Sequence, residues 1–167
     1  MKQKKSTKIQ PRVSIICGSS SDYNLVRETE KILKKLKIKF DTRIVSAHRT
    51  PRRMFDWATN LHKKYTCCIA FAGGSASLPS VTAALSQGIP TIGVPVETSK
   101  LKGLDSILSM CMCPQGCPLA TMPIGKAGAI NAALFAAEII GTFDHKVKAN
   151  VLRWKRNQTQ SVKKRPK

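Results

Sequence analysis

The stretch Cys67-Cys68-Ile69-Ala70-Phe71-Ala72-Gly73-Gly74 is a short apolar run that ends on two glycines. An uninterrupted apolar run of this length is typical of a central strand in a parallel sheet, because helices cover both faces of such a strand. The residues that follow, 78–85, are predicted to form a short helix. A buried strand, a glycine turn and a helix together indicate an α/β protein.

The same alternation of strand and helix extends through most of the chain. Strands are predicted at residues 13–17, 40–45, 67–72, 91–96 and 119–123. Helices are predicted at residues 23–36, 51–64, 78–85, 105–111 and 126–140. Because such units form right-handed crossovers, residues 13–144 are predicted to fold as one α/β domain, a three-layer α/β/α sandwich around a parallel sheet. Residues 1–12 are predicted to be a basic disordered arm, and residues 145–167 a basic C-terminal helix and tail.

Charge and hydropathy limit the class of protein. The chain has 167 residues, is 42% hydrophobic and carries a formal net charge of +20. Residues 1–12 carry five Lys or Arg and residues 145–167 carry nine, with no acid in either segment, whereas the body carries 15 against 9 acids. A polyanion-binding tail is one interpretation. Because no base-reading motif accompanies the charge, we interpret the ends as solvated segments and do not expect nucleic acid as a partner.

Two further sequence features bear on location and metal binding. No apolar run approaches the ~18 residues of a membrane span, and none follows the basic N-terminus as a signal peptide requires, so we expect a cytoplasmic protein without a membrane partner. Cys17, Cys67 and Cys68 lie in predicted strands and are interpreted as small buried hydrophobes. The spacing Cys111-x-Cys113-x-x-x-Cys117 matches no usual zinc pattern, so no metal is expected.

Three polar segments follow the first three predicted strands. They are Gly18-Ser19-Ser20-Ser21-Asp22, Ser46-Ala47-His48-Arg49-Thr50-Pro51 and Gly73-Gly74. The carboxyl ends of parallel strands lie along one edge of a sheet, which is where open α/β proteins bind ligands. We therefore expect all three segments to line one crevice.

The residue types in these segments predict an anion site beside a proton-transfer group. Free amides at the helix start after Gly18, together with serine hydroxyls, suit an anion. His48 can exchange a proton near neutral pH, and Arg49 offers a bidentate fork to phosphate or carboxylate. Gly73 and Gly74 allow close approach of the backbone.

Some of these residues also have a purely structural interpretation. Asp22 is placed either to cap the helix that follows it or to contact a ligand, and the sequence leaves both roles open. Thr50 and Pro51 are predicted as the N-cap and first residue of the next helix. His62 and His145 lack comparable neighbours and are interpreted as surface residues.

With these motifs, residues 13–140 resemble the PurE family of purine biosynthesis. The motifs that carry the resemblance are the three segments above together with Leu78-Pro79, Gly93-Val94-Pro95-Val96, Gly103-Leu104-Asp105-Ser106 and Ile124-Gly125-Lys126-Ala127-Gly128. The resemblance implies a flavodoxin-like fold and a homo-octamer with active sites at subunit contacts. It also implies an isomerase that converts N5-carboxyaminoimidazole ribonucleotide to 4-carboxy-5-aminoimidazole ribonucleotide without metal, ATP or organic cofactor.

The resemblance assigns roles to individual residues. His48 is implied to be the general acid/base. The ribose phosphate portion of the substrate is implied to lie against Ser19, Asp22 and Arg49, with Ser21 and Ser46 beside them. Where the family usually has histidine before Leu-Pro, this chain has Ser77. It also has Ser80 in place of the usual glycine, and Met112-Cys113 in place of the usual Gln-Met.

Two other functions remain open from the sequence. One is a sibling carboxylase that takes aminoimidazole ribonucleotide and free CO2. The other is a non-catalytic flavodoxin-like module that binds polyanions through its basic ends. The loop before Pro79 is more similar to the mutase branch than to the CO2-using branch, and the presence of His48 argues against a non-catalytic module.

Overall fold

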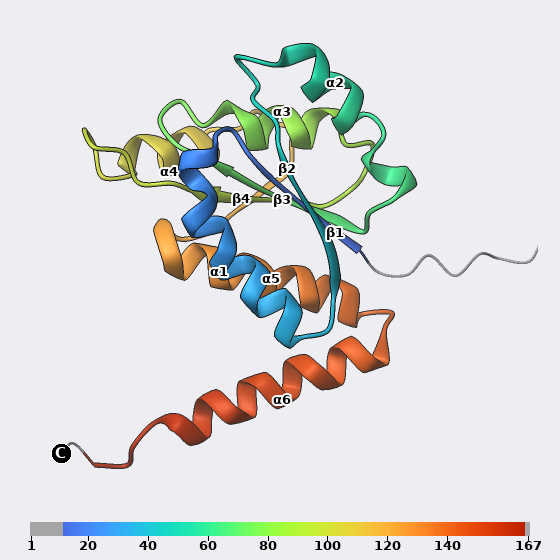
Figure 1. The fold of residues 1–167 in the computed structure, drawn as a ribbon, viewed down its shortest axis with the longest axis vertical. Coiled ribbons are helices and arrows are strands. Elements are labelled where there is room, and N and C mark those ends of the chain that lie inside the picture. The colour runs from blue at the N-terminus through green and yellow to red at the C-terminus, as the bar shows by residue number, and fades with distance from the viewer. Residues whose placement is uncertain (1–11, 166–167) are drawn as a thin grey trace, which may run out of the picture.

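The computed structural model describes residues 12–165, which form a five-stranded parallel sheet with helices on both faces (Figure 1). The strands are β1 (Arg12–Cys17), β2 (Lys39–Ile44), β3 (Cys67–Ala72), β4 (Thr91–Pro95) and β5 (Leu119–Thr121). The helices are α1 (Tyr23–Lys35), α2 (Pro51–Ala58), α3 (Ser77–Leu85), α4 (Leu104–Cys111), α5 (Gly125–Gly141) and α6 (His145–Ser161). Two short 3-10 segments, η1 (Ser20–Asp22) and η2 (Leu61–Lys63), join them.

The strand order is β2-β1-β3-β4-β5, and every pairing is parallel. This is the flavodoxin-like order, so the predicted fold class is confirmed. The chain runs from β1 to one edge of the sheet and then returns past β1 to build the other edge. The loops that leave β1 and β3 therefore diverge, and this divergence opens a crevice at the carboxyl edge.

Side chains of the central strand alternate between two separate hydrophobic cores. Cys67, Ile69 and Phe71 of β3 belong to the core that includes α1, α5 and α6, whereas Cys68 and Ala70 belong to the core of α2, α3 and α4. Figure 1 shows α2, α3 and α4 on one face of the sheet and α1 and α5 on the other. Burial of a side chain such as Phe71, which is fully enclosed, contributes about 1.5–3 kcal/mol.

The strand cysteines are buried, as predicted, and they are free thiols. Burial raises the pKa of Cys67 to about 12. A thiol with so high a pKa stays neutral at physiological pH and behaves as a small apolar group. These cysteines therefore serve packing within the sheet.

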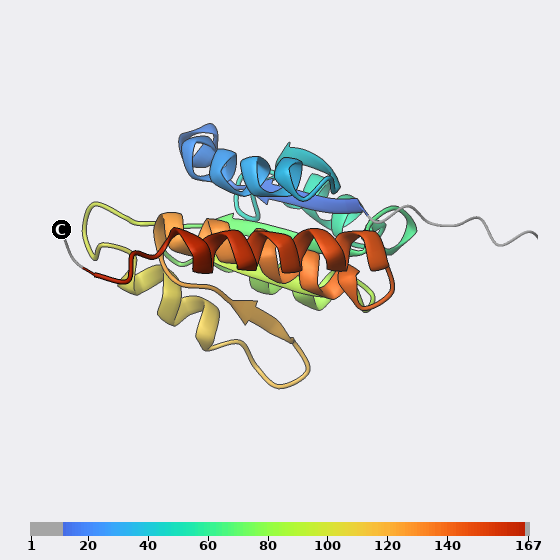
Figure 2. The ribbon, with the colours of Figure 1, turned by 90° about the horizontal axis from the view of Figure 1, so that it is seen from below.

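Helix α5 is buried along much of its length, as its composition predicts, and it brings α6 to the outside of the molecule. Small residues dominate its buried face, and a Cβ at Gly128 would lie 1.7 Å from the carbonyl oxygen of Pro123. Asp144 caps α6 by accepting from the amides of Lys146 and Val147. Figures 1 and 2 show α6 lying along α5, away from the sheet.

The structure departs from the sequence prediction at the end of α2. The helix predicted over residues 51–64 ends at Ala58. Thr59 Oγ1 donates to the carbonyl of Phe55, and Asn60 Nδ2 donates to the carbonyl of Asp56, at 2.8 and 2.7 Å. These side chains occupy carbonyls at the helix end, as polar residues commonly do. The η2 segment then places Leu61 in the core.

The first strand begins one residue before its predicted start. Arg12, which the sequence places in the N-terminal arm, pairs with Lys39 as the first residue of β1. Residues 1–11 of that arm lie outside the described residues. Among residues 12–165 no helix is both long and apolar enough to cross a membrane.

Candidate active site

The loops after β1, β2 and β3 line a cavity of about 450 Å³ at the carboxyl edge of the sheet. Its wall contains Gly18, Ser19, Asp22, Ser46, Ala47, His48, Arg49, Ala72, Gly73, Ala76, Ser77 and Leu78. The expectation that three separate loops meet at one crevice is therefore confirmed. Of the predicted site residues, Ser21 and Gly74 do not line this cavity. Ser21 donates a hydrogen bond to Asp22, and the amide of Gly74 donates one to Ser106.

In the first loop, Ser21 supports Asp22 from outside the cavity. Ser21 Oγ donates to Asp22 Oδ1 at 3.1 Å, and the amide of Ser21 donates to Ser19 Oγ at 3.3 Å. The side chain of Ser19 thus caps η1, whereas Asp22 makes no side-chain cap to α1. Asp22 occupies the N-cap position of α1, but its side chain makes no cap hydrogen bond, and the residue lines the cavity.

In the second loop, Thr50 binds Ser46 and holds the residues between them. Thr50 Oγ1 donates to the carbonyl of Ser46 and accepts from its amide, both at 3.0 Å. Thr50 and Pro51 are the N-cap and first residue of α2, as predicted, but the Thr50 hydroxyl makes no cap hydrogen bond to the helix because it binds Ser46. Ser46 Oγ accepts from the amide of Arg49 at 3.2 Å, so the turn that presents His48 is closed at both ends.

Arg49 joins the second loop to the first. Its Nη2 donates to the carbonyl oxygen of Gly18 at 2.7 Å. Other N–H groups of the guanidinium have no partner among residues 12–165. The cation is therefore fixed at the cavity mouth and keeps donors for an anion.

The third loop is held by a residue that the sequence reasoning did not single out. The buried hydroxyl of Ser106 accepts from the amide of Gly74 at 3.0 Å and donates to the carbonyl of Val96 at 2.8 Å. Its one signal in the sequence is its place in the Gly103–Ser106 motif. Within the loop, Ala76 has a left-handed backbone (φ 34°), a conformation that costs about 1–2 kcal/mol for a residue with a Cβ.

The strained loop leads directly into Ser77, which contacts the histidine. Ser77 Oγ lies 3.0 Å from Nε2 of His48. A hydroxyl can donate to or accept from an imidazole nitrogen, so this contact orients the ring in either tautomer. Ser77, which precedes Leu78-Pro79, is thus the hydrogen-bond partner of His48.

Burial raises the pKa values of two groups near the cavity, the carboxyl of Asp22 and the thiol of Cys17. Burial raises the pKa of Asp22 above its ordinary value, although hydrogen bonds from Ser21 and Ser19 and the charge of Arg49 oppose the increase. Burial and the Asp22 charge raise the pKa of Cys17 to about 11, so this thiol is not a nucleophile at neutral pH. Among residues 12–165 no cluster of His, Cys, Asp or Glu is arranged to hold a metal ion.

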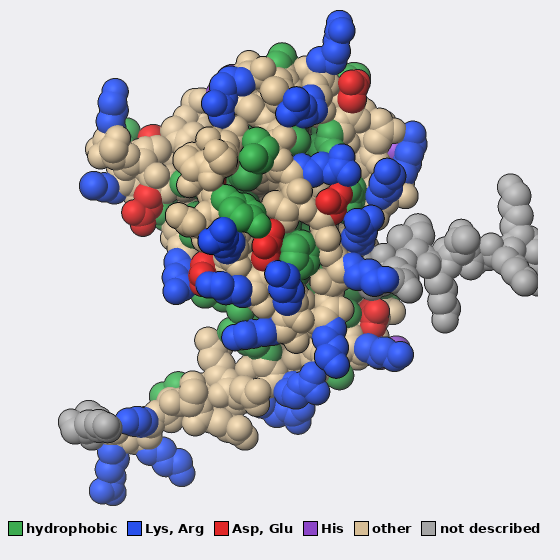
Figure 3. All heavy atoms as spheres, viewed as in Figure 1, with side chains coloured by type: hydrophobic (Ala, Val, Ile, Leu, Met, Phe, Trp, Pro, Cys, Tyr) green, Lys and Arg blue, Asp and Glu red, His purple; other side chains and the backbone are tan. Residues whose placement is uncertain are grey.

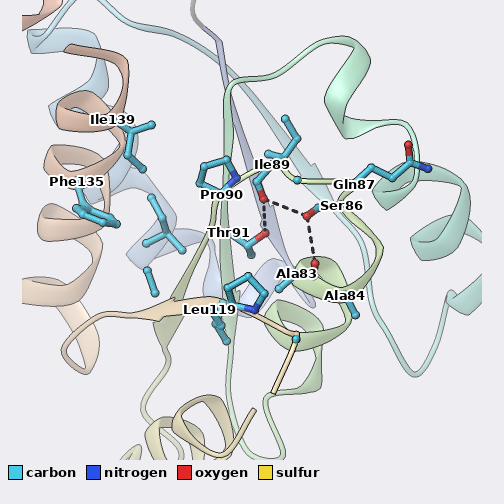
Figure 4. Close-up of a pocket in the computed structure, with 15 residues that line it drawn as sticks. Ala83, Ala84, Ser86, Gln87, Ile89, Pro90, Thr91, Leu119, Phe135 and Ile139 are labelled. Atoms are coloured by element: carbon cyan, nitrogen blue, oxygen red, sulfur yellow. Dashed lines mark hydrogen bonds between the residues drawn. The ribbon is translucent and has the colours of Figure 1, made fainter. Parts of the chain in front are cut away.

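A larger cavity of about 790 Å³ lies away from these groups, between α5 and the segments that precede β4 and β5 (Figure 4). Phe135 and Ile139 of α5 face Pro90 and Leu119 across it. The hydroxyls of Ser86 and Thr91 are bonded to backbone carbonyls, and no titratable side chain lines the wall. The side chains of His48 and Asp22, which could exchange a proton, line the smaller cavity and not this one.

A histidine beside an arginine, at the point where a flavodoxin-like sheet reverses its winding, gives this α/β protein a candidate ligand site at the carboxyl edge of the sheet. The sequence model of the AIR carboxylase family matches residues 12–161. The chain belongs to that family.

Relatives cover nearly the whole chain. Proteins named N5-carboxyaminoimidazole ribonucleotide mutase are 44% identical in Brucella melitensis and 43% identical in Bacillus subtilis, each over 155 residues, 92% of this chain and 95% of the relative. The protein of that name from Escherichia coli K12 is 40% identical over 156 residues, 93% of this chain and 92% of its own. The crystal structure of Treponema denticola PurE superposes with a TM-score of 0.81 at 28% identity, covering 90% of this chain and 92% of that one.

The raised pKa of Asp22 predicts a gain in stability for Asp22→Asn. When a carboxyl has a higher pKa in the folded state than in the unfolded state, the free energy of unfolding falls as pH rises through that pKa. The reason is that ionisation of the carboxyl is less favourable in the folded state. We expect Asp22→Asn to have a higher free energy of unfolding than the wild type at pH 7. This gain in the free energy of unfolding should disappear as pH falls below about 4, because Asp22 of the wild type is then protonated in both the folded and the unfolded state. Urea unfolding at several pH values measures this, with the exposed Asp56→Asn as control. A less stable Asp22→Asn at pH 7 would contradict the assignment.

Proposed function

We propose that the protein is an isomerase of purine biosynthesis that converts N5-carboxyaminoimidazole ribonucleotide to 4-carboxy-5-aminoimidazole ribonucleotide. One observation carries the proposal: His48 and Arg49, adjacent on one braced loop, line the cavity at the point where the sheet reverses its winding. Relatives named for this reaction align with more than nine-tenths of the chain, which supports it. The reaction needs no metal, ATP or organic cofactor.

The first step is to hold the ribonucleotide. Arg49 offers the substrate phosphate its fork, and Ser19 adds a hydroxyl beside it. The carboxylate of Asp22 accepts hydrogen bonds, which suits ribose hydroxyls. Gly73 has no side chain to keep the substrate away from the backbone of the third loop.

The second step moves one carboxyl group and one proton. The N–C bond of the N-carboxylate breaks, its electron pair stays on nitrogen, and protonated His48 gives that nitrogen a proton as CO2 is released. The aminoimidazole carbon then attacks CO2, and neutral His48 removes the proton from that carbon. The histidine returns to its starting state, so the reaction is a balanced isomerisation. Retaining CO2 beside the ring requires enclosure and orientation, and these account for much of the catalysis.

Ser77 positions His48 in this scheme. A serine hydroxyl carries no charge near pH 7, so it cannot replace the histidine as acid or base. Its 3.0 Å contact with Nε2 holds the imidazole against the cavity. The resemblance to the PurE family implies a second imidazole at this position, and this chain has a neutral hydroxyl there.

We also propose that the protein acts in the cytoplasm as a homo-octamer with its active sites at subunit contacts. The larger cavity of Figure 4, an apolar groove beside α5, supports the proposed assembly, because Phe135 in its wall is 38% exposed. Helix α6 supports it too, since Leu152 is 51% exposed on a helix that lies outside the sandwich. Exposed apolar surfaces of this kind mark protein contacts.

A substrate-choice assay separates the proposed mutase from the sibling carboxylase. We expect the wild type to form the 4-carboxylated product from N5-carboxyaminoimidazole ribonucleotide without ATP. Aminoimidazole ribonucleotide with bicarbonate should give product far more slowly. Product from the second mixture alone would assign the carboxylase activity, and product from neither would contradict both enzyme functions.

Three variants test the division of labour between His48 and Ser77. His48→Asn keeps hydrogen bonding but cannot carry a proton, so kcat should fall by about 10²-fold or more while the ribonucleotide still binds. Ser77→Ala keeps His48 but removes the hydroxyl that orients its imidazole, so kcat should fall by roughly 10-fold. His62→Asn, on the exposed η2 segment, is the control and should match the wild type. Normal turnover by His48→Asn together with an inactive Ser77→Ala would reverse the assignment.

Assembly is measured directly by light scattering after size exclusion. We expect a particle of eight chains, each of 18.3 kDa. Phe135→Glu places a charge in the apolar groove and should shift the particle to smaller assemblies without unfolding the chain. A wild-type mass of one chain at micromolar concentration would contradict the proposed octamer.

A further inference from the structure

A second concentration of charge lies on the outer side of α2, away from the candidate active site. A cavity of about 620 Å³ is formed there by β2, α2 and η2 and the residues that follow η2. Its wall carries five cationic side chains, those of Arg43, Arg52, Arg53, Lys63 and Lys64. No residue lines both this cavity and the one that contains His48.

The cations of this cavity are poorly neutralised. Asp56 is the one carboxylate in the wall. Arg52, Arg53 and Lys64 make no side-chain hydrogen bond or ion pair with any residue from 12 to 165. Figure 3 shows blue side chains gathered on the side of the molecule where η2 and β2 lie. Like charges on one concave wall repel each other, and a bound anion relieves that repulsion.

The other two cations, Arg43 and Lys63, have hydrogen-bond partners, but the net charge of the cavity wall stays positive. Arg43 Nη2 lies 3.1 Å from Asp41 Oδ2, and the hydroxyl of Tyr65 donates to the same oxygen at 2.6 Å. Lys63 Nζ donates to the neutral amide oxygen of Asn60 at 2.6 Å. The wall is thus braced by hydrogen bonds without being neutralised.

Cations are more concentrated around this cavity than in the rest of the domain, where some lysines are paired with acids. Glu28 pairs with both Lys31 and Lys126, and Glu138 pairs with Lys155. Residues 39–65, in contrast, contain seven Lys or Arg and two acids. The rest of residues 13–144 carries eight Lys or Arg and seven acids, so the excess positive charge of the domain is concentrated in this segment.

The wall also contains a donor without an acceptor. The indole Nε1–H of Trp57 is buried and has no hydrogen-bond partner among the described residues. Leaving a buried donor unpaired costs about 1–3 kcal/mol.

We propose that this cavity is a second anion site, which binds a linear polyphosphate group, either free or as the triphosphate of a nucleotide. The volume lies in the range of roughly 300–1,000 Å³ that small-molecule sites occupy. Two adjacent arginine forks on the first turn of α2 suit successive phosphates, which they bind bidentately. A two-fold contact between two copies of this wall does not suit the cavity, because the facing cations would repel each other. The concave shape favours a compact polyanion over duplex nucleic acid.

Because the two cavities share no lining residue, polyphosphate and substrate would not compete for the same side chains. This separates the proposal from the assignment of the active site, so either can fail alone. Calorimetric titration of the full chain with tripolyphosphate at 0.15 M salt measures binding at the new site. We expect micromolar affinity, with ATP as a second titrant. Equal affinities would indicate that the phosphates suffice, and tighter ATP binding would indicate a contribution from the nucleoside.

Paired variants locate the ligand. Arg52→Gln with Arg53→Gln should weaken tripolyphosphate binding at least 10-fold, because both forks are lost while α2 keeps its helix formers. Lys163→Gln with Lys164→Gln removes the same charge from exposed residues beyond α6 and should leave the affinity within twofold. Arg49→Gln removes the phosphate donor of the active site, so any tripolyphosphate bound there is lost, while the affinity at the new site should stay within twofold of the wild type. Circular dichroism confirms that each variant is folded.

Four results would overturn the proposal. They are no binding by the wild type at millimolar tripolyphosphate, full affinity in the Arg52/Arg53 double variant, loss of affinity in Arg49→Gln, and equal loss in the Lys163/Lys164 control. A 20-base-pair DNA duplex that binds the wild type more tightly than tripolyphosphate, and depends on the same two arginines, would assign the surface to nucleic acid instead.

Discussion

The parallel pairing of β1 with β2 on one side and β3 on the other is the constraint on which the site depends. Cys17, the last residue of β1, is level with Ile44 of β2 and Phe71 of β3. Three loops therefore leave the sheet at the same height, next to one another. No loop has to reach far to meet the others, so each can be short and stiff. A one-residue slip of any strand would move its loop out of line and turn its side chains into the opposite layer.

Each of the three loops is then fixed by hydrogen bonds that involve no ligand. Thr50 closes the second loop on Ser46, and Arg49 ties that loop to the carbonyl of Gly18. Ser106 reaches from α4 to hold Gly74 in the third loop. Such bracing sets the positions of His48 and Arg49 before a substrate arrives. Groups held in place in advance lower a barrier more than groups that must reorganise during the reaction.

The sequence predicted those parts of the molecule that depend on local pattern. The apolar runs and the turns that follow them located every strand and placed the three loops at one edge, because a parallel sheet leaves few alternatives. The end of α2 was missed since Thr59 and Asn60 bind helix carbonyls, an outcome that periodicity does not contain. Asp22 illustrates a second limit. Capping by Ser19 and capping by Asp22 are equally good sequence patterns, and tertiary geometry decides between them.

Contacts between distant segments lay further beyond the sequence. Ser106 is 32 residues from Gly74 in the chain, and Ser77 is 29 residues from His48. Nothing in the spacing of these serines indicates a partner. The cavity lined by Arg52, Arg53 and Lys64 has the same origin, because η2 brings the two charge-bearing segments together only after α2 has ended at Ala58.

The central claim is that the cavity between the three loops holds the ribonucleotide with its imidazole ring beside position 48. A crystal structure of the slow variant His48→Asn soaked with N5-carboxyaminoimidazole ribonucleotide tests it most directly. We predict that the phosphate lies within hydrogen-bond distance of Arg49 and Ser19, and that the aminoimidazole carbon faces the side chain at position 48. A ribonucleotide bound instead in the apolar groove beside Phe135, or against Arg52 and Arg53, would contradict the account.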